Sequence, residues 1–269
     1  MAPHGCESDH PLAGKHVIVT RPLEQGAGAS PNSPDILEQR LGDWGARVSA
    51  IPLVTIAAVP FQVPGGEFDW LFFTSKNAVR AFFDRLPGDS PLRMLSVAVV
   101  GPATAKALPP YGVEASFVSP RFDAEGVAQA FIQGYACQGL RILWPCGNLA
   151  SQDLPEILSR AGAHVTPLVV YETTLRQALS ESERLRLQAP ADLLVFTSPS
   201  AVTAYCQLMS TEDAKPAIAC LGPKTRQAAM ALFGRVDVQA EPSTLEALAE
   251  AIKTYYCQKE DAHDFEPGD

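Results

Sequence analysis

The sequence predicts an α/β protein whose parallel sheets are flanked by helices and whose chain is internally duplicated. The segments 69–79 and 192–202 share one pattern: a short apolar run, then Thr-Ser, then apolar residues at helical spacing. A run too short for a helix followed by that period is typical of a strand, a tight turn and a helix. Further motifs recur in the same order about 120 residues apart, far beyond the roughly 20–50 residues of a solenoid repeat. Strands that alternate with helices in this way form parallel sheets.

Length and composition favour two soluble domains. At 269 residues the chain is long enough for two domains of roughly 100–150 residues. Hydrophobic residues make up 46% and charged residues 19%, as in ordinary globular proteins. Apolar runs stay well below the roughly 18 residues that cross a bilayer, and the N-terminal residues lack the basic start and apolar core of a secretory signal. We therefore expect a cytoplasmic protein that makes no membrane contact.

Charge and the metal-binding residue types narrow the choice of partner. The net charge of −9 argues against nucleic acid, because contact with the phosphate backbone needs a basic face. The six cysteines contain no C-x-x-C pair, so reduced thiols are expected instead of a disulfide framework. The five histidines are scattered and offer no visible set of metal ligands. A small anionic molecule remains open as a partner.

Glycine and proline residues indicate where the elements before the first Thr-Ser motif end. Gly45 is expected to end a helix, and Pro52 indicates that its strand lies at an edge or leaves the sheet there. In order, we expect a disordered tail (1–13), a buried strand (14–22), a loop (23–34), a helix (34–45) and a second strand (47–55).

The remaining elements repeat this order. After the first Thr-Ser unit (69–86) we expect a strand (95–100), a Gly-Pro turn (101–104), a short helix to 108, a brief strand (117–120) and a helix (124–134). The second copy supplies a strand (139–145), a helix (154–161), a strand (162–171), the second Thr-Ser unit (192–209), a strand (218–221), a Gly-Pro turn (222–225), a helix (245–252) and an acidic tail (258–269).

The Thr-Ser pairs have two interpretations. Ser75 and Ser198 fall at predicted helix N-caps, where a hydroxyl accepts from the exposed N–H groups of the first turn. Capping alone would explain them. Both pairs also lie at the carboxyl ends of strands, where open α/β sheets bind ligands, and free N–H groups at a helix start suit an anion. The recurrence of the motif favours a binding site for anions that is used twice.

Taken together, the motifs resemble the uroporphyrinogen-III synthase family over roughly residues 14–255. The segments that carry the resemblance are 20–22 (Thr-Arg-Pro), 73–79 (Phe-Thr-Ser-Lys-Asn-Ala-Val), 100–105 (Val-Gly-Pro-Ala-Thr-Ala), 170–173 (Val-Tyr-Glu-Thr), 196–198 (Phe-Thr-Ser) and 221–225 (Leu-Gly-Pro-Lys-Thr). The resemblance implies two α/β domains joined by a two-stranded linker near 55–56 and 171–172. It implies the following boundaries: 14–54 with 174–257 as domain 1, 57–169 as domain 2, and tails at 1–13 and 258–269.

The resemblance also implies a substrate, hydroxymethylbilane, which is a linear tetrapyrrole with eight carboxylates. Arg21 closes the first strand on the expected binding edge, although it could equally be a surface salt-bridge residue. The loop 145–152 carries no cation, so it can offer only backbone N–H groups and Asn148. The candidate substrate-binding residues are Arg21, Thr74, Ser75, Asn77, Gly101, Thr104, Gly147, Asn148, Thr197, Ser198, Ser200, Gly222, Lys224 and Thr225.

The implied activity is that of a lyase in tetrapyrrole, porphyrin and haem biosynthesis. The reaction removes the terminal hydroxyl of ring A as water and closes the macrocycle with inversion of ring D. It needs no metal or other cofactor, and we expect a monomer. Tyr171 is the candidate catalytic acid, because a phenol with a pKa of about 10 is protonated at neutral pH and can donate a hydrogen bond. Tyr171 could instead be a packed strand tyrosine, and the chain could be a non-catalytic two-domain binding or sensor protein for an anionic metabolite.

Overall fold

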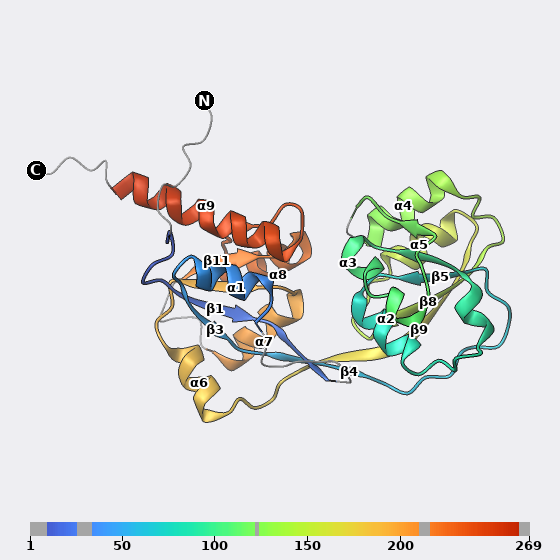
Figure 1. Cartoon of the computed structure of the whole chain (residues 1–269), viewed down its shortest axis with the longest axis horizontal. Helices are drawn as coiled ribbons and strands as arrows, with labels where there is room; N and C mark the ends of the chain where they lie inside the picture. Colours follow the sequence, from blue (N-terminus) through green and yellow to red (C-terminus); the bar gives the residue numbers. More distant parts are fainter. Residues whose placement is uncertain (1–9, 26–33, 122–123, 210–215, 264–269) are drawn as a thin grey trace, which may run out of the picture. The chain divides into compact units, whose positions relative to one another are not determined.

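The computed structural model describes residues 10–25, 34–121, 124–209 and 216–263. The chain divides into two compact units (Figure 1). Unit 1 combines Met1–Thr55 with Thr174–Asp269, whose described parts are coloured blue and yellow to red, and unit 2 is the continuous segment Ile56–Thr173. The boundaries between the units fall inside two strands, β4 (Val54–Ala58) and β9 (His164–Leu175).

Unit 1 contains a five-stranded sheet in the order β12-β11-β10-β1-β3, and all its pairings are parallel. Its strands are β1 (His16–Thr20), β3 (Arg47–Ala50), β10 (Leu193–Phe196), β11 (Ala217–Cys220) and β12 (Val238–Gln239). Its helices are α1 (Ile36–Asp43), α6 (Glu181–Gln188), α7 (Pro199–Leu208), α8 (Pro223–Phe233) and α9 (Leu245–His263).

The helices of unit 1 cover both faces of this sheet. Val17 and Val19 of β1 pack in one core cluster with residues of α1 and α9. Ile18, between them, packs in another cluster with residues of α6, α7 and α8. Because successive side chains of a strand point to opposite faces, α1 and α9 cover one face and the other three helices cover the second. This is the arrangement of an open parallel α/β sheet.

Unit 2 is built around most of the second sheet, which has the strand order β2-β4-β9-β8-β5-β6-β7; β2 and the unit 1 ends of β4 and β9 come from residues of unit 1. The strands not yet given are β2 (Pro22–Gln25), β5 (Trp70–Phe73), β6 (Ser96–Val99), β7 (Phe117–Val118) and β8 (Arg141–Gly147). The helices are α2 (Lys76–Phe83), α3 (Pro102–Ala105), α4 (Ala124–Gly134) and α5 (Asp153–Arg160), with short 3₁₀ turns at Pro91–Met94 and Pro109–Tyr111.

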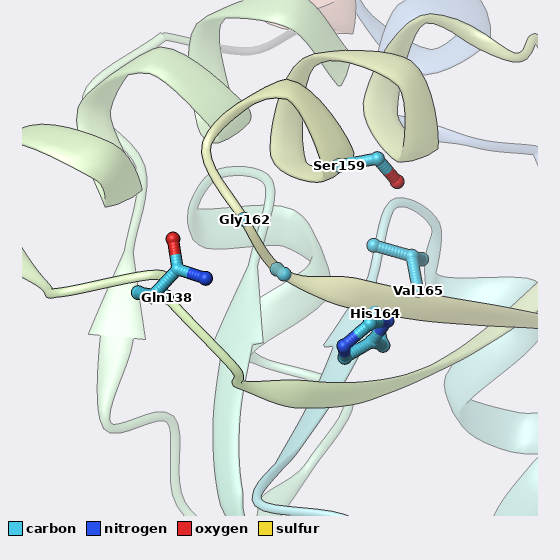
Figure 2. Close-up of a pocket in the computed structure, with 6 residues that line it drawn as sticks. Gln138, Ser159, Gly162, His164 and Val165 are labelled. Atoms are coloured by element: carbon cyan, nitrogen blue, oxygen red, sulfur yellow. The ribbon is translucent and has the colours of Figure 1, made fainter.

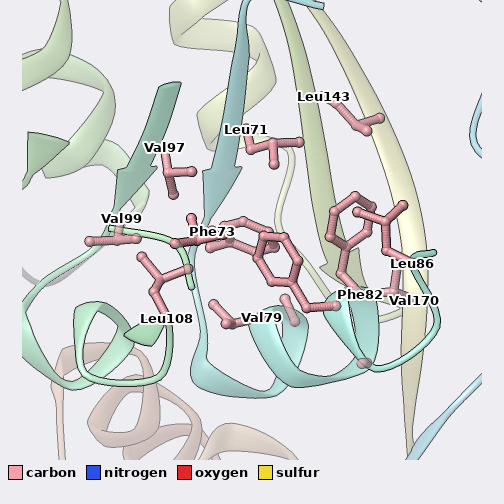
Figure 3. Close-up of a cluster of buried hydrophobic side chains, with 14 of the residues drawn as sticks. Leu71, Phe73, Val79, Phe82, Leu86, Val97, Val99, Leu108, Leu143 and Val170 are labelled. Carbon is pink, nitrogen blue, oxygen red and sulfur yellow. The ribbon is translucent and has the colours of Figure 1, made fainter. Parts of the chain in front are cut away.

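The buried strand β5 divides the core of unit 2 in the same way. Leu71 and Phe73 pack with Phe82 of α2, and the rings of Phe73 and Phe82 meet edge to face at 5.7 Å (Figure 3). Trp70 and Phe72 point to the other face, where they pack with α4 and α5. The predicted α/β class, with parallel sheets flanked by helices, is confirmed.

Both ends of the chain differ from the sequence prediction. The expected N-terminal tail is wrong at its end, because Leu12 is fully buried and its N–H donates to the Trp44 carbonyl at 3.0 Å. The expected acidic tail at 258–269 is wrong at its start, because α9 continues to His263. Acidic composition alone does not end a helix, and residues 258–263 include no glycine or proline that would break it. Residues 1–9 and 264–269 lie outside the described residues.

Three internal predictions also need correction. The loop expected at 23–34 begins as strand β2, and residues 26–33 lie outside the described part. The strand expected at 47–55 is two strands, β3 and β4, which are separated where Pro52 interrupts the pairing. Helix α6 was not predicted, because its apolar stripe is weak and Leu187 is its one buried residue.

No helix in the described part of the chain combines the length and the apolar character needed to cross a membrane. The five cysteines that the structure describes form no disulfide bond with one another.

Candidate functional site

The carboxyl ends of the unit 2 strands carry most of the predicted residues of that half. Phe73 at the end of β5 is in register with Val99 at the end of β6, so the residues that follow them begin at one edge of the sheet. Thr74 and Ser75 follow β5, and Gly101 follows β6. Parallel register therefore gathers these residues, although they are distant in sequence.

Ser75 is the N-cap of α2, as predicted. Its backbone is extended, and its Oγ accepts from the N–H of Ala78 at 3.1 Å. The same Oγ lies 3.3 Å from the phenolic oxygen of Tyr171, close enough for a hydrogen bond in which either hydroxyl donates. Ser75 therefore connects the start of α2 to the candidate acid.

Tyr171 lies half-buried on β9. Burial raises the pKa of its phenol, the hydrogen bond with Ser75 lowers it, and the neighbouring Cys146 raises it. The net direction is upward from the ordinary value of 10.0, so the phenol carries its proton at neutral pH. A neutral phenol can donate a hydrogen bond to a leaving oxygen.

Two predicted residues lie at the end of β8 and in the turn that follows it. Gly147 is buried and is the last residue of that strand. The exposed Asn148 uses both ends of its amide on β9: Oδ1 accepts from the Thr173 N–H at 2.8 Å and Nδ2 donates to the Thr173 carbonyl at 3.3 Å. The side chain of Asn148 is thus engaged with the strand that carries Tyr171.

The remaining predicted residues of unit 2 belong to α2 and α3. Asn77 is half-buried in the first turn of α2. Gly101 is the N-cap of α3 and adopts φ +77°, a conformation that suits glycine. Thr104 is only 4% exposed, so its side chain belongs largely to the interior of the unit.

Unit 1 repeats this arrangement at the carboxyl edge of its own sheet. Phe196 is in register with Thr20 on one side and Cys220 on the other. Thr197 Oγ1 donates to the Thr20 carbonyl at 3.2 Å, and Ser198 caps α7 by accepting from the Ala201 N–H at 3.3 Å. Ser200 lies in the first turn of the same helix, with its Oγ 3.0 Å from that of Ser198. The second predicted N-cap is therefore also confirmed.

The start of α8 holds three more predicted residues and lies beside Ser243, which the sequence analysis did not single out. Gly222 is the N-cap, Lys224 is exposed, and Thr225 is 4% exposed. A Cβ on Gly222 would lie 2.8 Å from Ser243 Oγ, so Ser243 approaches this helix start closely. The Ser-Thr pair at 243–244 before a predicted helix was the available signal, and Thr244 does cap α9.

Arg21, at the end of β1, forms an ion pair within unit 1. Its Nε lies 3.2 Å from Oε1 of Glu38, and the two side chains are 20% and 8% exposed. Burial raises the pKa of Glu38 to about 7, against the opposing effect of Arg21 and with a further increase from Asp35. The contact of Arg21 in the structure is thus a salt bridge, as the alternative to a binding role had it.

A depression of about 420 Å³ lies elsewhere in unit 2 (Figure 2). It opens beside the start of β9, whereas Tyr171 lies beyond the middle of that strand. It is lined by Gln138, Ser159, Gly162, Ala163, His164 and Val165, none of which was predicted as a site residue. Among the described residues, no group of three or more His, Cys, Asp or Glu side chains is placed to hold a metal ion.

The two units define a duplicated α/β protein of the open parallel-sheet class, with serine-capped helices at the carboxyl edge of each sheet. A family model described as uroporphyrinogen-III synthase HemD matches residues 35–250. The chain therefore belongs to the uroporphyrinogen-III synthase family, and the resemblance stated from the sequence motifs is confirmed.

Individual relatives agree with this membership. The uroporphyrinogen-III synthase of Synechococcus elongatus is 32% identical over 271 residues, which cover 92% of this chain and 98% of that protein. The uroporphyrinogen-III synthetase structure from Helicobacter pylori is similar with a TM-score of 0.64 at 20% identity, over 89% of this chain and 99% of that one. A mutant uroporphyrinogen III synthase structure from Thermus thermophilus gives a TM-score of 0.57 at 16% identity, over 91% and 99%. At these identities the two structures support the fold alone.

Proposed function

We propose that this chain is a uroporphyrinogen-III synthase, a cyclising lyase that converts hydroxymethylbilane into uroporphyrinogen III. The observation that carries the proposal is family membership over nearly the whole chain, with 98% of a uroporphyrinogen-III synthase covered. The alternative of a non-catalytic binding protein is not favoured by these relatives. We further propose that the two compact units are the two domains expected from the sequence.

The proposed reaction needs little acid assistance but requires the substrate to be held in one geometry. Loss of the ring A hydroxyl from a pyrrolic methanol gives a cation stabilised by the ring nitrogen, so the bond breaks readily. The same cation closes spontaneously without inversion and gives the type I isomer. An enzyme must therefore hold ring D so that its substituted carbon attacks, which is catalysis by positioning.

In this proposal Tyr171 assists departure of the hydroxyl. The Ala78 N–H donates to Ser75 Oγ at 3.1 Å, and Ser75 Oγ lies 3.3 Å from the phenolic oxygen. When the Ser75 hydroxyl donates to that oxygen, the phenolic proton is left to donate to the leaving group. The raised pKa of Tyr171 keeps this proton in place at neutral pH.

The carboxylates of the substrate are assigned to the helix starts at the carboxyl edge of each unit. The N-termini of α2, α7 and α8 carry the predicted hydroxyl and N–H donors (Thr74, Ser75, Asn77, Thr197, Ser198, Ser200, Lys224 and Thr225). Each exposed helix N-terminus stabilises an anion by roughly 0.3–1 kcal/mol. Recognition would rest mainly on neutral donors, together with Lys224 and Arg21. We propose a cytoplasmic monomer, which sedimentation of the purified protein tests.

The activity is tested by incubating purified protein with freshly prepared hydroxymethylbilane, oxidising the products and separating the type I and type III porphyrins by chromatography. We expect type III to accumulate above the spontaneous type I background, and heat-inactivated protein to give type I alone. Type I as the sole product at the spontaneous rate would refute the proposed reaction. Saturable binding of the substrate without turnover would then support the binding-protein alternative.

A further inference from the structure

The end of the β8–β9 pairing in unit 2 contains a β-bulge. Cys146 is paired with Val169, and the next residue of β8, Gly147, is paired with Tyr171, which leaves Val170 as an extra residue on β9. An extra residue bends its strand and changes the direction of the side chains that follow it. The bulge lies immediately before the candidate acid.

The bulge determines which face of the sheet Tyr171 occupies. In a regular strand, neighbouring residues point to opposite faces. Here Leu168 and Val170 belong to the core cluster that includes residues of α2, and Tyr171 packs against the same cluster. Figure 3 shows Val170 in this cluster. Regular alternation after Val170 would have directed Tyr171 away from α2. The extra residue therefore brings the phenol to the side where Ser75 begins that helix.

Gly147 leaves the space that the tyrosine ring occupies. A Cβ built on Gly147 would lie 2.5 Å from Cζ, 2.6 Å from Cε2 and 2.8 Å from the phenolic oxygen of Tyr171. At these distances a side chain at position 147 would force the tyrosine ring to move. Gly147 does not have the positive φ that would by itself favour glycine. Contact with the ring, and not the backbone conformation, is thus what favours glycine at this position.

Asn148 holds the backbone of β9 at Tyr171 and two residues after it. Its N–H donates to the Tyr171 carbonyl at 3.2 Å. Its side-chain amide accepts from the Thr173 N–H and donates to the Thr173 carbonyl. The segment from 171 to 173 is therefore fixed to the turn after β8 by three hydrogen bonds.

We propose that Gly147 and Asn148 are positioning residues that act through Tyr171, setting the depth at which its phenol lies beside Ser75. This inference rests on the reaction proposed above and deepens it. A displacement of about 1 Å in a catalytic group can reduce turnover about 10²-fold, because the reacting atoms no longer meet in line. Gly147 leaves the space that the ring fills, and Asn148 fixes the backbone that carries the ring.

Position is tested without turnover by fluorine NMR of protein labelled with 3-fluorotyrosine. The chain has six tyrosines, and the Tyr171 resonance is the one lost in Tyr171→Phe. Gly147→Ala should shift that resonance and lower its titration midpoint, because the displaced ring becomes more exposed to solvent. The matched control is Gly134→Ala at the end of α4, where a Cβ meets nothing within 4 Å and which should leave the resonance unchanged. An unshifted Tyr171 resonance in Gly147→Ala overturns the inference.

Kinetics test whether the position matters to the reaction. Gly147→Ala should lower kcat by about 10²-fold with little change in KM. In the Tyr171→Phe background the same substitution should lower kcat by less than about 3-fold, because the effects of two residues that act through one another are not additive. Equal losses in the two backgrounds would mean that Gly147 acts independently of Tyr171, and that overturns the proposal. Wild-type protein that makes no type III product would refute the proposed function instead, and the NMR result would still decide whether Gly147 positions the ring.

Should Gly147→Ala fail to fold, Asn148 gives a second test. Asn148→Ala should move the Tyr171 resonance and lower kcat, whereas Asn148→Asp keeps the acceptor for the Thr173 N–H and should restore part of both. If Asn148→Ala and Asn148→Asp behave alike and match wild type, the positioning role is refuted.

Discussion

Tyr171→Phe separates acid assistance from positioning. The substitution removes one hydroxyl and keeps the half-buried ring that packs against the core of unit 2. Its effect on folding should be small, because one neutral hydrogen bond of 3.3 Å is lost and Ser75 keeps its bond to the Ala78 N–H. We expect a loss of about 0.5–1 kcal/mol in the free energy of unfolding.

The expected catalytic effect of Tyr171→Phe is larger. Acid catalysis contributes about 10²–10⁴-fold, and the low end applies here because the cation forms readily. We therefore expect a rate about 10²-fold below wild type, with type III still the main enzymatic product, since inversion depends on how ring D is held. The assay is chromatography of both isomers, corrected for spontaneous closure. An unchanged rate would remove Tyr171 from the mechanism, whereas a slow enzyme that releases mostly type I would mean that Tyr171 shapes the bound chain.

Three further predictions concern charge. The hydrogen bonds from Arg176, with those from Ser180, lower the pKa of Glu183 from 4.5 to about 2 in spite of burial, so its stabilising effect is present above pH 4.5 and is lost as the pH falls to about 2. The free energy of unfolding of Glu183→Gln should therefore be about 2 kcal/mol below that of wild type at pH 7. In thermal melts this difference in stability should disappear toward pH 2, and a difference that does not depend on pH would contradict the prediction. Burial raises the pKa of Glu38 from 4.5 to about 7 in spite of Arg21, so its favourable contribution is present below pH 4.5 and is lost as the pH rises through about 7. Glu38→Gln should have a higher melting temperature than wild type at pH 8 but not at pH 4. A variant that is less stable than wild type at pH 8 would refute this prediction. Finally, affinity for the linear tetrapyrrole, measured by fluorescence titration, should fall only modestly from low to physiological salt, because donors within a site are screened less than exposed cations over a Debye length of about 8 Å; a steep fall would indicate binding dominated by Arg and Lys.

Features that depend on neighbours in the sequence were predictable. The caps at Ser75 and Ser198 involve a hydroxyl and an N–H three residues apart, so the sequence contains both partners. Helix α6 shows what happens when the apolar period is weak: its capping box at Ser180 and Glu183 was present, but Leu187 alone is buried. The boundaries of the two tails were predicted from composition and were wrong for a related reason. The burial of Leu12 and the continuation of α9 to His263 decide where the tails begin and end.

The sequence by itself therefore determined the duplicated α/β class, the order of most elements and the residue types at the strand ends. It placed Tyr171 on a strand and Gly147 in a turn without connecting them. Only the tertiary structure decided that the ring of one occupies the side-chain position of the other, that Ser75 reaches the phenol, and that Arg21 meets Glu38. The physical reason is register. A single extra residue in β9 reverses the face to which Tyr171 points, and such a shift depends on the packing of whole strands, which no local pattern of residues specifies.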